Sequence, residues 1–130
     1  MSTIVVGYVP NSLGDAAIQE AVREARRRTA SLLVVNTTRA DRLVDPGYAD
    51  SDDVSKLESV LRDSGVEYTI QHGVSEATAA EEVLDAAQAT GAELIIIGLR
   101  HRTPVGKLIM GSTAQNILLA AKCNVLAVKL

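Results

Sequence analysis

Short apolar runs without polar alternation are the feature that most constrains the fold of this chain. Four of them cover residues 4–9, 32–35, 94–97 and 125–128, and a weaker fifth covers residues 66–71. A continuous run rich in Val, Ile and Leu is typical of a strand that is buried on both faces, as in a parallel sheet. We therefore expect five strands in one parallel sheet.

The segments between these runs have the period of an α-helix. Apolar residues recur there at spacings of three and four, so that each segment carries one apolar stripe. The stripes are Ile18, Ala21, Val22 and Ala25; Val54, Leu57, Val60 and Leu61; Ala79, Ala80, Val83, Ala86 and Ala87; and Ala114, Ile117, Leu118 and Ala121. With right-handed crossovers, this alternation of strands and helices predicts an open, doubly wound α/β sheet with helices on both faces.

The ends of the helical segments carry residue types that cap helices. Hydroxyl side chains accept hydrogen bonds from the first N–H groups of a helix, and glycine adopts the left-handed conformation that ends one. We predict N-caps at Ser51 and Ser75, C-caps at Gly65 and Gly91, and a capping box at Ser112 with Gln115. Residues 37–50 form one long polar connection.

The composition is that of one globular domain, residues 1–130. Apolar residues make up 47% of the chain but aromatic residues only 2%, so aliphatic side chains must fill the core. The one cysteine, Cys123, has no partner for an internal disulfide, which fits a reducing compartment. No apolar run approaches the roughly 18 residues that span a bilayer, and the first residues lack a basic leader. We expect a cytoplasmic protein.

Charge is distributed unevenly along the chain. The last 37 residues contain five cations and no acid, whereas the first 93 contain eight cations and sixteen acids. A local basic region on a protein of net charge −3 favours a small anionic ligand. A nucleic-acid duplex normally requires a broader basic face, so we expect no nucleic-acid partner.

Two loops that follow predicted strands are the candidate ligand site, because doubly wound sheets bind ligands beyond the carboxyl ends of their strands. The first is residues 9–12. The second is residues 98–111, which contain three glycines and three cations and lead into a helix at Ser112. Glycines let the backbone approach a phosphate, and a helix N-terminus offers free N–H groups. The second loop therefore predicts an anion site, but not a Walker A loop, because Leu108 follows Lys107.

The same segment resembles the C-terminal signature of the universal stress protein family. In that pattern a glycine is followed by two residues, a second glycine, nine residues, a third glycine and then Ser or Thr. Gly98, Gly111 and Ser112 match it, while His101 stands in place of the second glycine. The opening IVVGYVPN and the closing NVLAVK also resemble the family, so the similarity covers the whole chain.

The resemblance implies a Rossmann-like sheet of the adenine nucleotide alpha hydrolase type, with strand order 3-2-1-4-5. It also implies a homodimer and, in one branch of the family, bound ATP or AMP with Mg²⁺ as the accompanying metal. On this basis the base and ribose lie against Gly7, Val9 and Val35. The phosphates then meet Gly98, His101, Gly111, Ser112 and Thr113, with positive charge added by Arg100, Arg102 and Lys107.

Two departures from the family pattern leave the function open. Val9 stands where nucleotide-binding members usually carry an aspartate, and a valine cannot hydrogen-bond a ribose. His101 either crowds the loop with its Cβ or donates a hydrogen bond to a phosphate. One hypothesis is an adenine-nucleotide-binding regulatory or sensing module in the stress response. The alternative is a dimeric stress-response scaffold that binds no nucleotide and acts through protein contacts.

Catalytic residues cannot be located in the sequence. No Ser-His-Asp or paired-carboxylate arrangement is apparent, so a nucleotide-hydrolysing enzyme is a weaker third hypothesis and any ATP hydrolysis is expected to be slow. His72 has no companion residues at metal-ligand spacing. We assign no catalytic residue and no protein metal site.

The C-terminal run predicts the mode of self-association. In the order 3-2-1-4-5, the strand at residues 125–130 lies at an edge of the sheet, and an apolar, unpaired edge tends to find a partner. Pairing with a second copy across a two-fold axis gives the expected homodimer.

Overall fold

The computed structural model describes residues 2–39, 41, 44–99 and 110–130. Over these residues strands and helices alternate strictly, as predicted. The elements are β1 (Ser2–Gly7), α1 (Ser12–Arg28), β2 (Ala30–Arg39), α2 (Ser51–Ser64), β3 (Tyr68–Ser75), α3 (Ala79–Thr90), β4 (Leu94–Gly98), α4 (Ser112–Ala120) and β5 (Asn124–Val128).

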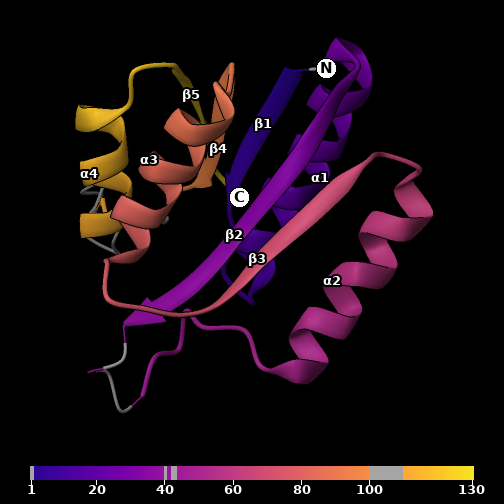
Figure 1. Ribbon diagram of the computed structural model, residues 1–130. Coiled ribbons are helices and arrows are strands. Elements are labelled where there is room, and N and C mark those ends of the chain that lie inside the picture. Colours follow the sequence, from indigo (N-terminus) through magenta and orange to yellow (C-terminus); the bar gives the residue numbers. More distant parts are fainter. Residues whose placement is uncertain (1, 40, 42–43, 100–109) are drawn as a thin grey trace.

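The five strands form one parallel sheet in the order β3-β2-β1-β4-β5 (Figure 1). Ile4 of β1 is in register with Leu32 of β2 on one side and with Leu94 of β4 on the other. The strand order that the family resemblance implied is therefore confirmed. The order reverses between β1 and β4, which makes the carboxyl ends of these two strands the switch point of the sheet.

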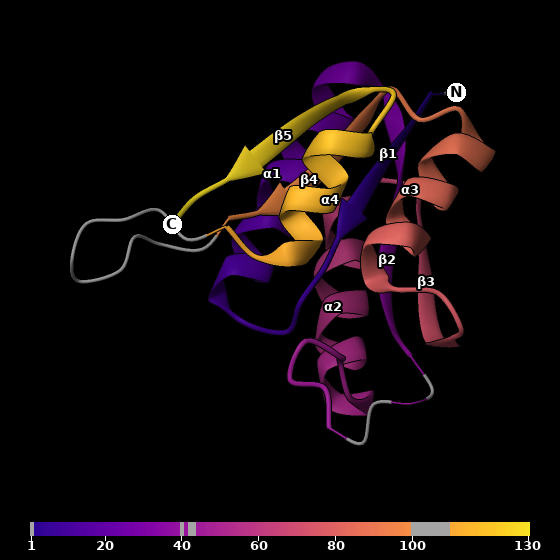
Figure 2. The ribbon, with the colours of Figure 1, turned by 90° about the vertical axis from the view of Figure 1, so that its left-hand side faces the viewer.

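Helices cover both faces of the sheet. Figure 1 shows α1 and α2 on one face and α3 and α4 on the other, and Figure 2 shows the α3–α4 layer in front of the strands. The layers explain the unbroken apolar runs: Ile4 and Val6 pack in the core cluster that includes α1 and α2, whereas Val5 packs in the cluster that includes α3 and α4. All three side chains are fully buried.

Strand β2 is longer than predicted. It runs through Asn36, Thr37 and Thr38 to Arg39, so the polar connection that was expected from residue 37 begins later. These three polar residues are buried because they stay in register with residues 72–74 of β3. Strand β3 is shifted as well, beginning at Tyr68 and ending at Ser75.

The predicted C-caps are confirmed, but the predicted N-caps are wrong. Gly65 and Gly91 end α2 and α3 in the left-handed conformation, at φ of 74° and 61°. Asp50 caps α2 in place of Ser51, and Thr78 caps α3 in place of Ser75. Both form capping boxes with an acidic residue three positions on, a stronger arrangement than a lone serine provides.

Helix α4 also begins differently from the prediction. Its N-cap is Gly111, and Ser112 is the first helical residue, so the predicted box between Ser112 and Gln115 does not form.

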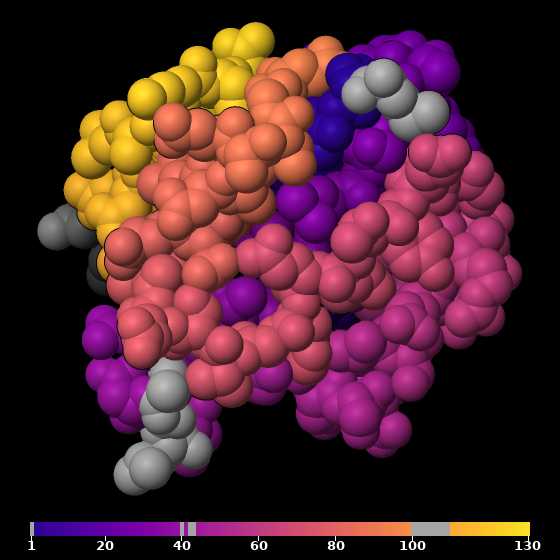
Figure 3. Space-filling model, in the orientation of Figure 1, coloured from indigo at the N-terminus to yellow at the C-terminus, as the bar shows by residue number. Residues whose placement is uncertain are grey.

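In the space-filling view α2 and β3 occupy the right-hand side of the molecule and α3 the left (Figure 3). Within the described ranges, no helix is long and apolar enough to cross a membrane.

Candidate functional site at the switch point of the sheet

The carboxyl ends of β1 and β4 lie side by side at the switch point and bring two predicted site residues together. Gly7 ends β1, and a Cβ built on it would lie 3.5 Å from Ile97 Cγ2 and 3.6 Å from Val83 Cγ2. These are ordinary van der Waals distances. Packing therefore does not require a glycine at position 7, and this half-buried residue lies at the carboxyl end of β1, where β1 pairs with β4.

Gly98, at the end of β4, is required by packing. A Cβ there would lie 2.5 Å from Leu13 Cγ and 3.0 Å from both Leu13 methyl carbons. Leu13, in the first turn of α1, thus lies directly against the β4 backbone. Sequence reasoning missed Leu13, because no local pattern links it to a glycine so far along the chain.

The loop between β1 and α1 is a tight turn closed by its own hydrogen bonds. Asn11 N–H donates to Val9 O at 2.9 Å, and Asn11 Oδ1 accepts from Gly14 N–H at 3.0 Å. A Cβ on Gly14 would lie 1.7 Å from Val9 O, so only glycine fits there. The Val9 side chain faces the connection between β2 and α2, with Cγ1 3.6 Å from where a Cβ of Gly47 would be.

Val35 and Asn36 anchor the second side of this loop. Val35 is 2% exposed, and its carbonyl accepts from Tyr8 N–H at 3.0 Å. Asn36 Nδ2 donates to Tyr8 O and to Gly47 O, both at 2.8 Å, and Asn36 Oδ1 accepts from Ala49 N–H at 2.8 Å. This buried amide ties the two loops together. In the sequence, the one indication of this role is that Asn36 is a polar residue directly after the apolar run 32–35.

Thr37 is the neighbouring buried polar residue on β2. It is 8% exposed, and its Oγ1 has no hydrogen-bond partner among the described residues. Strand alternation places it on the same face of the sheet as Val35, which packs in the cluster that includes α3. Sequence reasoning did not single it out.

The N-terminus of α4 differs from those of the other described helices. Asn11, Asp50 and Thr78 cap α1, α2 and α3, and each of those helices has an acid in its first turn. Helix α4 has neither a capping side chain nor an acid in its first turn. Its first intrahelical bond runs from Gln115 N–H to Gly111 O at 3.0 Å, so the preceding N–H groups have no acceptor within the helix. Ser112 and Thr113 beside them are exposed.

This uncapped end lies at the carboxyl edge of the sheet. Helix α4 follows β4 and leads to Asn124, which is in register with Leu94 at the opposite edge, so α4 runs antiparallel to the strands. Among the described residues, the structure thus combines N–H groups without a helical acceptor, a positive dipole end and two glycine-terminated strands at the switch point, an arrangement able to hold an anion. The predicted site residues Arg100, His101 and Arg102, together with Lys107, lie outside the described residues.

His72, in register with Asn36, contacts the connection between β2 and α2. His72 stacks on Tyr48 with ring centroids 4.6 Å apart, and its Nε2 is 2.8 Å from Ala49 O. No group of three or more His, Cys, Asp or Glu side chains suited to a metal occurs within the described part of the chain.

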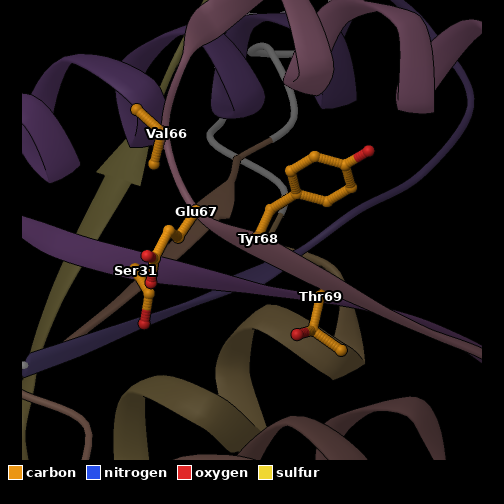
Figure 4. A pocket seen from close by; sticks show the side chains of 5 residues that line it. All are labelled: Ser31, Val66, Glu67, Tyr68 and Thr69. Atoms are coloured by element: carbon orange, nitrogen blue, oxygen red, sulfur yellow. The ribbon is translucent and has the colours of Figure 1, made fainter.

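A hollow of about 420 Å³ is lined by Ser31 and residues 66–69 (Figure 4). Figure 4 shows Tyr68 and Thr69 on opposite sides of β3. Because β2 and β3 both start here, the hollow is at the amino edge of the sheet and is not part of the switch-point crevice.

Fold and site together define a Rossmann-like, doubly wound α/β domain with a helix that starts without a side-chain cap at its switch point. The family model described as "Universal stress protein family" matches residues 1–129. A universal stress protein from Mycolicibacterium smegmatis is 48% identical over 126 residues, which cover 97% of this chain and 96% of that protein. The chain belongs to the universal stress protein family.

Solved structures agree with this assignment. A universal stress protein from Archaeoglobus fulgidus matches with a TM-score of 0.77 and 28% identity over 98% of each chain. A structure of the universal stress protein from the same organism in complex with dAMP matches with a TM-score of 0.68 and 21% identity, over 98% of this chain and 97% of that one.

Proposed function

We propose that this protein binds an adenine nucleotide, ATP or AMP, at the crevice between β1 and β4 and acts as a regulatory or sensing module in the stress response. The observation that carries the proposal is the N-terminus of α4, which has no capping side chain and no acid in its first turn. An anion near a helix N-terminus is stabilised by about 0.3–1 kcal/mol, and more where the site is partly buried. The Archaeoglobus structure with dAMP supports an adenine nucleotide as the ligand.

Each end of the nucleotide has a proposed place in the crevice. Base and ribose are placed against Gly7 and Val9 and beside Val35, whose side chain is itself only 2% exposed. The phosphates are held by Gly98, Gly111, Ser112 and Thr113, with the cations Arg100, Arg102 and Lys107 and the side chain of His101 following β4 in the sequence. Mg²⁺ is proposed only as the ion that accompanies ATP. We also propose that the protein is cytoplasmic and that residues 1–130 form one domain.

A charge placed at the proposed phosphate site tests the assignment. Ser112→Glu puts a carboxylate on the first residue of α4. There its negative charge interacts favourably with the helix dipole but repels a bound phosphate. The matched control is Ser51→Glu, which makes the same change at the first residue of α2. We expect Ser112→Glu to weaken ATP and AMP binding by about tenfold or more, the size of a lost hydrogen bond to a charged group. The melting temperature should not fall.

The control separates the proposal from a general charge effect. Ser51→Glu should bind nucleotide as the wild type does, measured by equilibrium titration of both variants. Equal affinities in Ser112→Glu and the wild type would contradict phosphate binding at α4.

We also propose a homodimer that forms through the C-terminal strand, residues 125–130. Strand β5 is an edge of the sheet, and each of its apolar side chains is only partly buried. Leu119 on α4 and Leu130 after β5 are 79% and 55% exposed. An unpaired strand edge flanked by exposed leucines is a surface that a second copy would cover.

A second candidate function, the dimeric scaffold without nucleotide, is favoured by one observation. Val9, in the loop after β1, has Cγ1 3.6 Å from the Cβ position of Gly47, and its side chain has no atom able to hydrogen-bond a ribose. This candidate predicts an intact dimer that gives no binding signal with any adenine nucleotide. It also predicts that Ser112→Glu changes nothing measurable.

A further inference from the structure

Three consecutive polar residues at the end of β2 are buried, and one of them differs from the other two. Asn36, Thr37 and Thr38 are 4%, 8% and 9% exposed. Asn36 makes three hydrogen bonds, and Thr38 Oγ1 donates to Asp45 Oδ2 at 2.5 Å. Thr37 Oγ1 is buried and has no hydrogen-bond partner among the described residues. Because buried hydroxyl groups normally have a partner, the partner of Thr37 lies beyond these residues.

The Thr37 side chain faces the layer formed by α3 and α4. Thr37 is in register with Gly73 of β3, and the residues two positions before and after Gly73 both bond a side chain of α3. Gln71 Nε2 donates to Glu82 Oε2 at 2.8 Å, and Ser75 Oγ donates to Glu82 Oε1 at 2.5 Å. Alternate residues of a strand share a face, and so do residues in register. The polar side chains nearest to Thr37 on this face therefore bond one another and leave its hydroxyl unpaired.

Thr37 also lies beside the proposed place of the base. Val35 is in register with Gly7, the last residue of β1, and its side chain packs in the cluster that includes α3. Thr37 is two residues further along β2 on the same face, so it lies beyond the end of β1 at the carboxyl edge of the sheet. A base beside Val35 is next to Thr37.

The distance from Thr37 to the proposed phosphate site suits a nucleotide. Only β1 separates β2 from β4, so these two strands are two strand spacings apart, about 10 Å. Helix α4, with its uncapped N-terminus, follows β4 and lies with α3 on the face that Thr37 occupies (Figure 1). A nucleoside monophosphate whose phosphate is at α4 is long enough to place its base at β2.

We infer that the Thr37 hydroxyl hydrogen-bonds the base of the bound nucleotide, which makes Thr37 a specificity-determining residue. The inference rests on the proposed nucleotide-binding function. A threonine hydroxyl both donates and accepts, so it can donate to a ring nitrogen of the base or accept from an amino group. A ligand that lacks a base leaves this buried hydroxyl unpaired and is discriminated against for that reason.

Thr37→Val tests the inference, because it removes the hydroxyl and keeps the branched shape of the side chain. We expect it to weaken AMP binding by about fivefold, the size of a hydrogen bond between neutral groups. Ribose 5-phosphate, which has the sugar and phosphate but no base, should bind Thr37→Val and the wild type equally. Thr37→Ser, which keeps the hydroxyl, should bind AMP as the wild type does. Titrations followed by amide NMR measure all of these affinities.

Thr38→Val is the matched control. It makes the same change at the neighbouring position, which is equally buried but faces the connection between β2 and α2. Thr38→Val should lower the melting temperature of the ligand-free protein, because it removes the hydrogen bond to Asp45, and should keep the AMP affinity of the wild type. Thr37→Val should not lower the melting temperature, because it removes no hydrogen bond of the ligand-free protein.

The outcomes separate this inference from the proposed function. If the wild type binds AMP and Thr37→Val binds it equally tightly, the hydroxyl is paired with a buried water, and the inference is overturned while the proposed function stands. Equal losses of AMP and ribose 5-phosphate affinity in Thr37→Val would also overturn a contact with the base. A lower melting temperature of ligand-free Thr37→Val would place the partner of the hydroxyl within the chain. Absence of AMP binding by the wild type would contradict the proposed function and this inference together.

Discussion

Gly98 and Gly7 end the two strands at the switch point, yet they are glycines for different physical reasons. A Cβ on Gly98 would lie 2.5 Å from Leu13 Cγ, whereas one on Gly7 would meet only ordinary contacts at 3.5 and 3.6 Å. The family signature includes a glycine at position 98, where it suggests close approach of a phosphate. In this chain the closest atoms to that position belong to Leu13, so the packing of α1 on β4 is sufficient to explain the residue.

Gly98→Ala should therefore destabilise the fold, while Gly7→Ala should not. Overpacking of this kind typically costs about 1–3 kcal/mol. A Gly→Ala change where the backbone and the space allow it instead stabilises by about 0.4–1 kcal/mol. Urea unfolding of both variants measures the difference.

The double variant Leu13→Ala with Gly98→Ala tests the cause. Removal of the Leu13 methyl groups should relieve the clash. The double variant should therefore lose less free energy of unfolding than the sum of the losses in the two single variants. Strict additivity would show that Leu13 is not what Gly98 accommodates.

At the scale of helices and strands, α3 shows how one capping box stabilises an element. Thr78 Oγ1 accepts from Glu81 N–H at 3.2 Å, and Glu81 Oε1 accepts from the Thr78 hydroxyl at 2.9 Å and from its N–H at 3.2 Å. The Thr78 side chain and then its backbone N–H lower the pKa of Glu81 below the ordinary value of 4.5. The ionised form of Glu81 is thus favoured in the folded state.

Thr78→Ala should lower the free energy of unfolding by about 1 kcal/mol at neutral pH. A carboxylate whose folded pKa is lowered contributes stability above its unfolded pKa and loses it as pH falls through the folded pKa. The difference between wild type and Thr78→Ala should therefore shrink on acidification below pH 4.5. Urea unfolding across this range measures it, and a difference that does not change with pH would exclude Glu81 from the cap.

Sequence reasoning was most successful at this scale. Five strands, four helices and both glycine C-caps were predicted, because apolar period and glycine conformation are local properties. The N-caps were wrong because Asp50 and Thr78, each with an acid three residues on, form boxes that Ser51 and Ser75 cannot form. The end of β2 was missed because Asn36, Thr37 and Thr38 are buried by pairing with β3, which no local pattern indicates.

The candidate site was only partly predictable for the same reason. The family signature placed Gly98, Gly111 and Ser112 at the switch point, and the sheet order brings them there. Leu13 and Asn36 position the same loops through contacts between segments far apart in sequence, and such contacts depend on the fold. The uncapped start of α4 became visible only once Gly111 replaced Ser112 as the cap.

For the whole molecule, the two edges of the sheet lead to different expectations. Strand β5 is short and flanked by exposed leucines, whereas β3, at the other edge, exposes Val74 at 64%. The proposed dimer uses β5.

Leu130→Asp should therefore convert the protein to monomer without unfolding it, because this half-exposed side chain belongs to neither core cluster. Val74→Asp, the same kind of change on β3, should leave the dimer intact. Sedimentation equilibrium of both variants measures the mass. A dimer that survives Leu130→Asp but not Val74→Asp would move the interface to the β3 edge.

Calorimetric titration of the wild-type protein with Mg-ATP, AMP and cyclic AMP tests the central claim most directly, with Gly111→Val as the variant at the α4 cap. The account predicts saturable binding of ATP or AMP at one site per chain, lost in Gly111→Val while the fold is retained. Heats no larger than those of dilution for every nucleotide would contradict it and favour the dimeric scaffold that binds no nucleotide.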